Sequence, residues 1–555
     1  MNENSSGSTG FEKLITFLIA SVAILASITV FLQNYASGKS AEAIRAAQEL
    51  AIRSTTTELQ GAIEFSYHWQ GAFQTWKEID LQRLEAELTD DMTAANRYSQ
   101  LRDRIVPLTP LLSEEFFDKN SSWPHLAKYE AYLYVVKATR FEQLYQATAD
   151  LGRAWSNIAD VFVIQLTLLT VALSLYGLSI TMRGFIRWMF VFVGSGLVLF
   201  CVLWMGWKLL EPLPVISEEA IDAFAEGYGQ YYQGNNAEAI ALYNKALSIN
   251  PDYADAIYER GYNNLVLGNY EAAVSDFLIA RDLGLDGEYT YWNLGWTYYL
   301  MGRFDDAIEA NNVILNSNPG IIGMRSNQAL NYLAKGDLER ARREYDSVVG
   351  EIQKQVSNKE TSDSLWYYVD AASLDLQNLV DRLSESSKDW TEAPPAEMVL
   401  GDHAHIIAFA QEQIVRLKES ILALEYTGSL PQAQEVMQVS PFAFGNVTFD
   451  AEGYISDFEV IPDAVFPNDT AAVSIQFTYT GSVPQDRLIW KFYLDGEEYA
   501  AFRAVSDTDL SSSDTWYQTV GFNYTNLFFL PPGEYTVELY GDYRLVQTGR
   551  FYVQP

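Results

Sequence analysis

Three long runs of apolar residues stand out in the first part of the chain. Residues 14–33, 158–181 and 188–207 are almost wholly apolar and uncharged. About 20 such residues are what an α-helix needs to cross a bilayer. Only Lys13 precedes the first run, whereas a cleaved signal peptide has a shorter apolar core behind several positive charges. The pattern therefore predicts three transmembrane helices, the first an uncleaved anchor after a short tail at 1–13.

Residues 36–155, between the first two runs, have the pattern of long helices. Residues 41–88 contain no Pro, and residues 125–160 contain no helix breaker except Gly152. Prolines at both ends of 106–124 predict a turn. We expect antiparallel, coiled-coil-like juxtamembrane arms. Aromatic residues cover more than one face of the first arm and need a partner, either the second arm or the following domain: Phe65, Tyr67, His68, Trp69, Phe73 and Trp76.

Between Ala220 and about Val348, small residues recur with a period of 34 residues. A small residue lets two helices approach closely, and a Gly after a helix supplies the positive φ of its C-cap. Each unit is therefore predicted to be a helix, a tight turn and a second helix, within a domain at 218–350. The columns are Gly227, Gly261, Gly295 and Ala329; Gly234, Gly268, Gly302 and Gly336; and Ala239, Ala273, Ala307 and Ala341.

This period resembles the tetratricopeptide repeat, TPR. Residues 227–251, GYGQYYQGNNAEAIALYNKALSINP, carry nearly the whole family signature. Leu285 stands where the first and third repeats have Pro, and Ala329 replaces a Gly in the fourth. The resemblance covers roughly 130 of the 555 residues. It implies an α-solenoid of four helix pairs whose first helices line a concave face that binds peptides or helices, and it implies no chemistry.

Aligned to the family, the groove-lining positions of the first helices are aromatic almost throughout. TPR modules that grip a C-terminal carboxylate use Lys, Asn and Arg there, so this resemblance does not imply a carboxylate clamp. Rigid aromatic rings suit a helix or an extended apolar peptide. The alternative is that the set packs against the protein's own helix at 366–368 or against a juxtamembrane arm. The candidate groove residues are Phe224, Tyr228, Tyr231, Tyr258, Tyr262, Trp292, Trp296 and Tyr299.

Residues 351–427 have the pattern of capping and linker helices. Residues 365–383 and 405–424 are amphipathic, and an acidic stretch with Ser and Pro separates them. A repeat array needs a cap at its open end, which is the role expected of the first helix. The second could fold back into the groove.

The pattern changes to a period of two in the last part of the chain. Residues 473–479 and 488–494 alternate apolar and polar side chains, as half-buried strands do. Regular short strands separated by turn residues predict an all-β sandwich at 440–555. The closing stretch 530–540, LPPGEYTVELY, is similar to the last hairpin of immunoglobulin-like modules found at the ends of secreted bacterial proteins.

Composition excludes a disordered chain, because 48% of the residues are apolar and 14% aromatic. Residues 208–555 hold 21 Lys and Arg against 52 Asp and Glu. A surface this acidic repels nucleic acid and anionic lipid, so we expect no nucleic-acid partner. The single cysteine, Cys201, lies in the third apolar run and excludes a disulfide framework.

Charge also predicts the orientation in the membrane. The short loop between the second and third runs carries Arg183 and Arg187, and the tail carries Lys13. Basic residues favour the cytoplasmic side. The expected location is therefore the cytoplasmic membrane, multi-pass, with the N-terminus inside and the C-terminal domains outside the cell interior.

The sequence shows no catalytic, cofactor or metal constellation. His403 and His405 are expected to be a surface pair, and Asp507, Asp509 and Asp514 match no EF-hand spacing. The multidomain membrane protein predicted here is a non-catalytic scaffold for a protein or peptide partner, with a homo-oligomer left open. The alternative is a transmembrane sensor whose juxtamembrane helices relay ligand binding.

Overall fold

The structure is a computed structural model that divides into two compact units, Met1–Asp286 and Gly287–Pro555. Several sequence predictions lie outside the described residues: the tail at 1–9, part of the turn at 106–124, and the side chains of Trp366, Asp507, Asp509 and Asp514. The structure describes residues 10–117, 123–358, 363–384, 392–427, 437–449, 455–468, 470–480, 487–499, 503–507, 515–521, 530–541 and 543–555.

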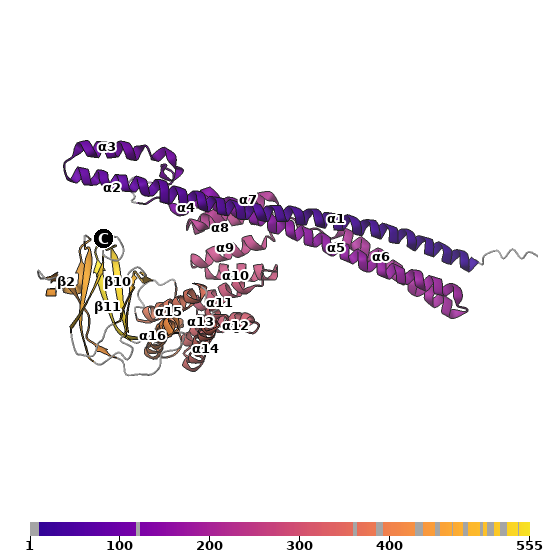
Figure 1. Cartoon of the computed structure of the whole chain (residues 1–555). Helices are drawn as coiled ribbons and strands as arrows, with labels where there is room; N and C mark the ends of the chain where they lie inside the picture. The colour runs from indigo at the N-terminus through magenta and orange to yellow at the C-terminus, as the bar shows by residue number, and fades with distance from the viewer. Residues whose placement is uncertain are drawn as a thin grey trace, which may run out of the picture. The chain divides into compact units, whose positions relative to one another are not determined.

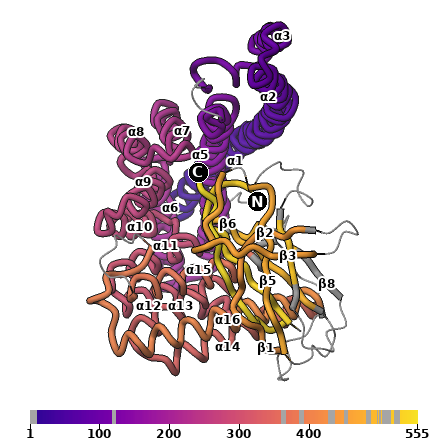
Figure 2. The backbone as a smooth tube through the Cα atoms, turned by 90° about the vertical axis from the view of Figure 1, so that its left-hand side faces the viewer, coloured from indigo at the N-terminus to yellow at the C-terminus, as the bar shows by residue number. Residues whose placement is uncertain are grey.

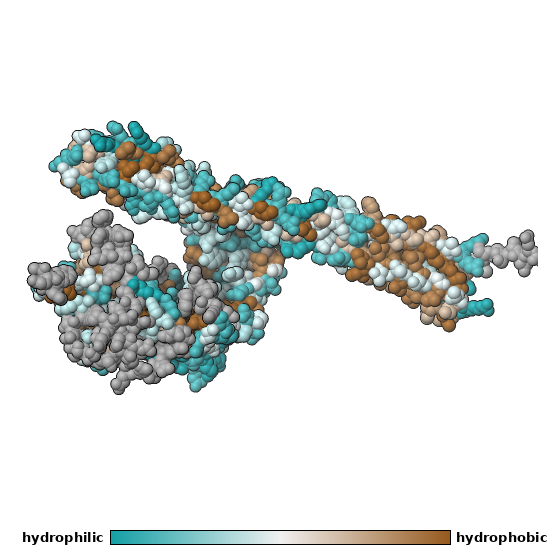
Figure 3. Space-filling model, viewed as in Figure 1, coloured by the Kyte–Doolittle hydropathy of each residue, from teal (hydrophilic) through white to brown (hydrophobic). Residues whose placement is uncertain are grey.

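The first unit begins with long helices (Figure 1). Three of them, α1, α5 and α6, are long and apolar enough to cross a membrane. Apolar side chains gather at the end of the molecule that these three helices share (Figure 3). The elements are α1 Gly10–Ser66, η1 Tyr67–Phe73, α2 Gln74–Leu88, α3 Met92–Asp103, η2 Val106–Leu108, η3 Pro110–Leu112, α4 Leu126–Glu130, η4 Ala131–Val135, α5 Val136–Thr181 and α6 Phe185–Leu210.

Helices α1 and α5 pack together antiparallel over most of their length. The buried side of α1 repeats every seven residues, and beyond the apolar run its members are small, which lets the two backbones approach. Hydrogen bonds fix the register: Ser40 Oγ donates to the carbonyl oxygen of Gly152 (2.9 Å), and Ser54 Oγ donates to that of Ala138 (3.0 Å). The buried positions are Ile15, Val22, Thr29, Ala36, Ser40, Ala43, Ala47, Ser54 and Gly61.

Most aromatic residues of the first arm form a core with the second arm and the segment between them, whereas Tyr67 is 67% exposed. Phe73 is fully buried and stacks on Trp69 with ring centroids 4.8 Å apart. His68 Nδ1 hydrogen-bonds the hydroxyl of Tyr129. Both arms contain a π-helical turn here, η1 and η4. The rest of the cluster comprises Phe65, Trp76, Ile105, Leu111, Leu112, Phe116, Phe117, Leu126 and Leu133.

Two helical hairpins complete the first unit. They are α7 Glu218–Tyr232 with α8 Asn236–Ile249, and α9 Ala254–Val266 with α10 Tyr270–Asp282. The predicted role of the glycines is confirmed: Gly234 and Gly268 follow first helices with φ of +81° and +76°. A Cβ added to Gly227 would lie 2.8 Å from the Tyr243 ring, so the small residue is needed where α7 meets α8.

The second unit begins with two more hairpins, whose helices lie side by side (Figure 2). Gly302 and Gly336 again have positive φ. Helices α15 and α16 form a further hairpin, in which α15 packs on α13 and α16 packs on α14. The bounds are α11 Glu288–Leu300, α12 Phe304–Leu315, α13 Ile322–Ala334, α14 Leu338–Ser357, α15 Asp363–Ser384, η5 Ala396–Met398 and α16 His403–Thr427.

The last part of the chain forms two sheets that pack face to face. One has the order β1-β5-β2-β3 with β9 on β5, and the other the order β4-β11-β10-β6-β7 with β8 on β6. Side chains from both sheets, such as Ile475, Phe477, Trp490 and Val537, fill the core between them. The bounds are β1 Gln438–Val439, β2 Ala443–Phe449, β3 Ile455–Val460, η6 Pro462–Ala464, β4 Val465–Phe466, β5 Ala472–Thr480, β6 Arg487–Leu494, β7 Glu497–Glu498, β8 Ala504–Asp507, β9 Thr515–Gly521, β10 Gly533–Gly541 and β11 Arg544–Val553.

Helix α16 covers the outer face of the second sheet. Its Leu422 and Ala423 pack against Ile489, Tyr540 and Tyr543. Charged side chains join the two layers around this apolar contact: Lys418 with Glu538, Glu419 with Arg544, and Glu425 with Arg503. The second amphipathic helix therefore has the sandwich and α14 as its partners.

Candidate functional site: a pocket between the arms and the first two hairpins

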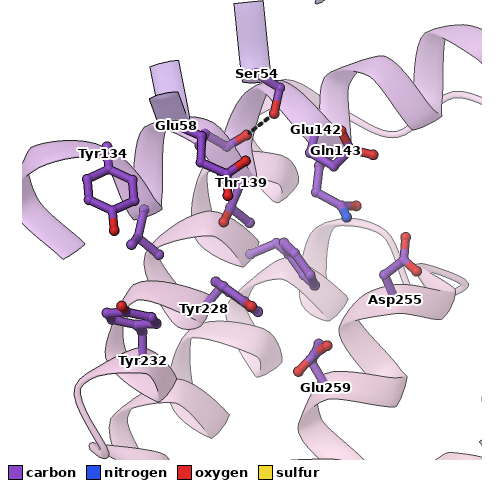
Figure 4. A pocket seen from close by; sticks show the side chains of 13 residues that line it. Ser54, Glu58, Tyr134, Thr139, Glu142, Gln143, Tyr228, Tyr232, Asp255 and Glu259 are labelled. Carbon is purple, nitrogen blue, oxygen red and sulfur yellow. Dashed lines mark hydrogen bonds between the residues drawn. The ribbon is translucent and has the colours of Figure 1, made fainter. Parts of the chain in front are cut away.

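A pocket opens in the first unit where the arms pack against helices α7 and α9. Its volume is about 520 Å³, within the range of small-ligand sites. Figure 4 shows residues of α1, α5, α7 and α9 around this space. The lining residues are Ser54, Glu58, Tyr134, Val135, Ala138, Thr139, Glu142, Gln143, Phe224, Tyr228, Tyr232, Asp255 and Glu259.

Close packing and polar contacts hold α5 on α7 beside the pocket. A Cβ added to Gly229 would lie 2.4 Å from Val136 Cγ2, so only a glycine allows this approach. The Arg140 guanidinium of α5 pairs with Asp222 and with Glu218 of α7. Because these contacts join helices far apart in the sequence, they fix the walls of the pocket.

The charge of the pocket has a single sign. Four lining residues are acidic and none is basic: Glu58, Glu142, Asp255 and Glu259. Asp255 and Glu259 are one helical turn apart on α9 and therefore share a face. Burial, reinforced by the nearby Asp255 charge, raises the pKa of Glu259 to about 7. Burial also raises the pKa of Asp255.

Tyrosine side chains form part of the wall. Tyr232 donates a hydrogen bond to Glu130 Oε2 (3.1 Å), and Tyr134 donates one to Glu130 Oε1 (2.9 Å). Burial raises the pKa of Tyr228 and of Tyr134 above the usual range. The hydroxyls are therefore neutral donors at physiological pH, and the rings offer π faces to a ligand.

The predicted groove residues of the first unit are only partly on this pocket. Phe224 and Tyr228 line it, but Phe224 is also buried against Tyr243, with ring centroids 5.5 Å apart. Tyr231 and Tyr262 contact each other edge to face at 5.6 Å. Tyr258 lies 5.5 Å from Phe277 of α10.

The predicted groove residues of the second unit pack against their own chain. Trp292 lies 5.6 Å from the ring of Tyr368 on α15. Trp296 lies 5.1 Å from Tyr299, which is 1% exposed. Trp292 therefore contacts the helix named in the self-packing alternative, whereas Tyr299 is buried against Trp296 and Phe304 of its own hairpin.

The four carboxylates are absent from the predicted site. Asp255 and Glu259 could have been noticed as an i, i+4 acidic pair on a first helix. Gly229 also differs from the equivalent positions of the next two repeats, Asn263 and Thr297, and this difference could have indicated a close helix contact at Gly229. The sequence gives no such indication for Glu58 and Glu142, because acidic residues are common in this chain.

Comparison with known families identifies the hairpins. A family model described as "TPR repeat" matches residues 227–264, and one described as "Tetratricopeptide repeat" matches residues 265–320. Residues 227–320 are tetratricopeptide repeats. This confirms the resemblance over that span, and it makes α7 and α9 the first helices of TPR pairs. No curated protein matches the chain.

Solved structures that are similar to parts of the chain include the following three. An immunoglobulin-like protein of Pseudomonas aeruginosa is 17% identical, with 22% of this chain and all of that one covered and a TM-score of 0.17. A tetratricopeptide repeat protein of Parabacteroides merdae is 14% identical, with coverages of 61% and 99% and a TM-score of 0.22. The Pseudomonas fluorescens alkylpurine DNA glycosylase AlkC, bound to DNA, is 10% identical, with coverages of 73% and 97% and a TM-score of 0.19. The TPR assignment rests on the family models.

Proposed function

We propose that this chain is a non-catalytic, membrane-anchored scaffold that binds a protein or peptide partner through its TPR segment, outside the cytoplasmic membrane. The observation that carries the proposal is the pocket on α7 and α9, because first helices line the binding face of TPR arrays. Anchoring is supported by three helices that are long and apolar enough to span a bilayer. The outside location is supported by Arg183 and Arg187 in the loop between two of them.

Partner capture from crosslinked membranes tests the scaffold. We compare the full-length protein with Tyr228→Ala, which removes a ring from the pocket, and with Tyr552→Ala, which removes a 40% exposed ring from the last strand. The expected result is that Tyr228→Ala loses a partner that the wild type and Tyr552→Ala retain, at a similar melting temperature.

A second variant covers the other aromatic positions. The double change Trp292→Ala and Trp296→Ala removes the two Trp rings from α11. Because Trp292 contacts Tyr368, this variant should lower the melting temperature, as loss of packed aromatic residues does. If every partner is retained both by this variant and by Tyr228→Ala, the scaffold function is wrong.

One observation favours a sensor as the second candidate. Helix α5 carries Ala138, Thr139, Glu142 and Gln143 of the pocket and continues without a break into the apolar run at 158–181. A partner that binds in the pocket therefore contacts the same helix that is predicted to cross the membrane.

Hydrogen exchange of the full-length protein in lipid nanodiscs, with and without the captured partner, tests the relay. A sensor should show altered protection at 144–157, between the pocket and the apolar run. Unchanged exchange there, with protection confined to the pocket residues, contradicts the sensor and leaves the scaffold in place.

A further inference from the structure

Among the residues that the structure describes, no basic side chain forms an ion pair with the acidic residues of the pocket. We propose that the pocket binds an organic cation, the ammonium or guanidinium group of a Lys or Arg side chain on the partner. This inference rests on the proposed function, because it names the chemistry of the partner segment. A free diamine has the same chemistry and is separated from a partner side chain by the test below.

Two basic side chains next to the pocket are already paired elsewhere, whereas the side chain of Lys137, between Val135 and Ala138, is exposed. Arg140, which follows Thr139 on α5, binds Asp222 and Glu218. Arg260, which follows Glu259 on α9, donates to Asp276 (2.6 Å) and to Asn244 (2.7 Å).

Within the part of the chain that the structure describes, no ion pair reaches the four pocket carboxylates. Glu142 accepts a hydrogen bond from Gln146 (2.8 Å), which supplies no charge. A partly buried carboxylate without a counter-charge is costly. A ligand that brings a positive charge therefore gains an interaction that the free protein lacks.

The other lining residues suit the rest of a long basic side chain. A cation over the face of an aromatic ring is attracted by the ring quadrupole, and Tyr134, Tyr228 and Tyr232 supply rings at the pocket. Lys and Arg also bury their methylene stems on apolar surface, which Val135 and Phe224 provide.

The proposal implies a pH dependence of binding. Glu259 is faced by Asp255 on its own helix, Tyr228 and Tyr231 on α7, Tyr243 on α8, and Glu58 and Glu142 on the arms. Since burial raises the pKa of Glu259 to about 7, its charge is incomplete at pH 6 and nearly complete at pH 8. Binding of a cation should therefore strengthen over this interval.

Saturation-transfer NMR on the full-length protein in neutral-lipid nanodiscs provides the test. The probes are Nα-acetyl-lysine methylamide, its norleucine analogue, which lacks the charge, and putrescine. Each is titrated against the wild type, Glu259→Gln, Asp255→Asn and the matched control Glu271→Gln, which removes a carboxylate from the exposed side of α10. The lysine probe should bind the wild type and the control alike and the two pocket variants at least about tenfold more weakly.

The outcomes distinguish a cation on a partner side chain from a free diamine, and they distinguish failure of this inference from failure of the scaffold function. Preference for the lysine probe assigns the cation to a partner side chain, whereas binding of putrescine alone supports the same chemistry with a free diamine. The inference is overturned if the norleucine analogue binds the wild type as tightly as the lysine probe does. It is also overturned if the lysine probe binds both pocket variants as tightly as the wild type, or if neither the lysine probe nor putrescine binds. If a partner is still captured in a Tyr228-dependent way in that case, the scaffold function stands; if that capture also fails, both are wrong.

Discussion

At the scale of one residue, ionisation of the Glu259 carboxyl group supplies charge to the pocket and lowers the free energy of unfolding. In the unfolded chain a Glu titrates near 4.5, whereas the pKa of Glu259 in the folded protein is raised to about 7. Between these values the folded state holds more protons than the unfolded state, so the free energy of unfolding falls as the pH rises. The loss is nearly complete at pH 8, about one unit above the pKa of the folded state.

We therefore expect Glu259→Gln to raise the melting temperature at pH 8 and to change it little at pH 4, where the wild-type carboxyl is already protonated. Thermal denaturation followed by circular dichroism at both pH values measures this difference. Glu271→Gln is the control and should show no such dependence. An equal shift at pH 4 and pH 8 would mean that Glu259 titrates normally.

Single residues also show which parts of the site the sequence predicts. The positive φ of Gly234 and Gly268 follows from the repeat itself, since a tight turn after a helix needs it. The surroundings of Phe224 and Trp292 do not follow from the repeat, because Leu144, which packs on the cluster of Phe224, and Tyr368 come from helices outside it; the sequence offered such packing only as an alternative to an open groove. A periodic pattern defines the faces of a helix but not the distant segment that covers each face.

At the scale of elements, α16 belongs with the β-sandwich. The alternation of apolar and polar residues predicted the strands of 473–479 and 488–494, and both are present in β5 and β6. The amphipathic pattern of 405–424 predicted a helix with one apolar face, but not that this face meets Ile489 and Tyr540. The sequence therefore predicts a sandwich at 440–555 without the helix that covers its outer face.

The expected consequence is that a fragment of 401–555 melts at a higher temperature than one of 440–555. The shorter fragment exposes Ile489, Tyr540 and Tyr543, which are at most 6% exposed in the structure, and it leaves the buried Glu538 without Lys418. Calorimetry of the two fragments measures the difference. Equal melting temperatures would show that α16 contributes nothing to the sandwich.

Two ion pairs of the longer fragment refine this comparison. Lys418→Ala should cost up to about 3 kcal/mol, because it leaves the nearly buried carboxylate of Glu538 unpaired. Arg550→Ala breaks an exposed pair with Glu534, and such pairs contribute at most about 1 kcal/mol. Similar losses in both variants would contradict a special role for the contact with α16.

At the scale of the whole molecule, the predicted topology follows from three spans and one basic loop. In the first unit the Arg187 guanidinium lies 3.8 Å from the centre of the Phe11 ring. The loop at 182–184 and the beginning of α1 are therefore at the same end of the helices. If all three candidate spans cross the membrane, the predicted topology places the arms and the chain after Leu210 on the side opposite to this loop.

Protease added to cells with a permeable outer layer tests this orientation. Because basic loops stay on the cytoplasmic side, the chain after Trp207 should be digested while a soluble cytoplasmic protein in the same cells remains intact. Arg183→Gln with Arg187→Gln removes the charges on which the orientation is argued and should leave part of the population protected. If the wild-type C-terminal region survives until the cytoplasmic membrane is breached, the orientation is reversed, and the pocket would meet its partner inside the cell.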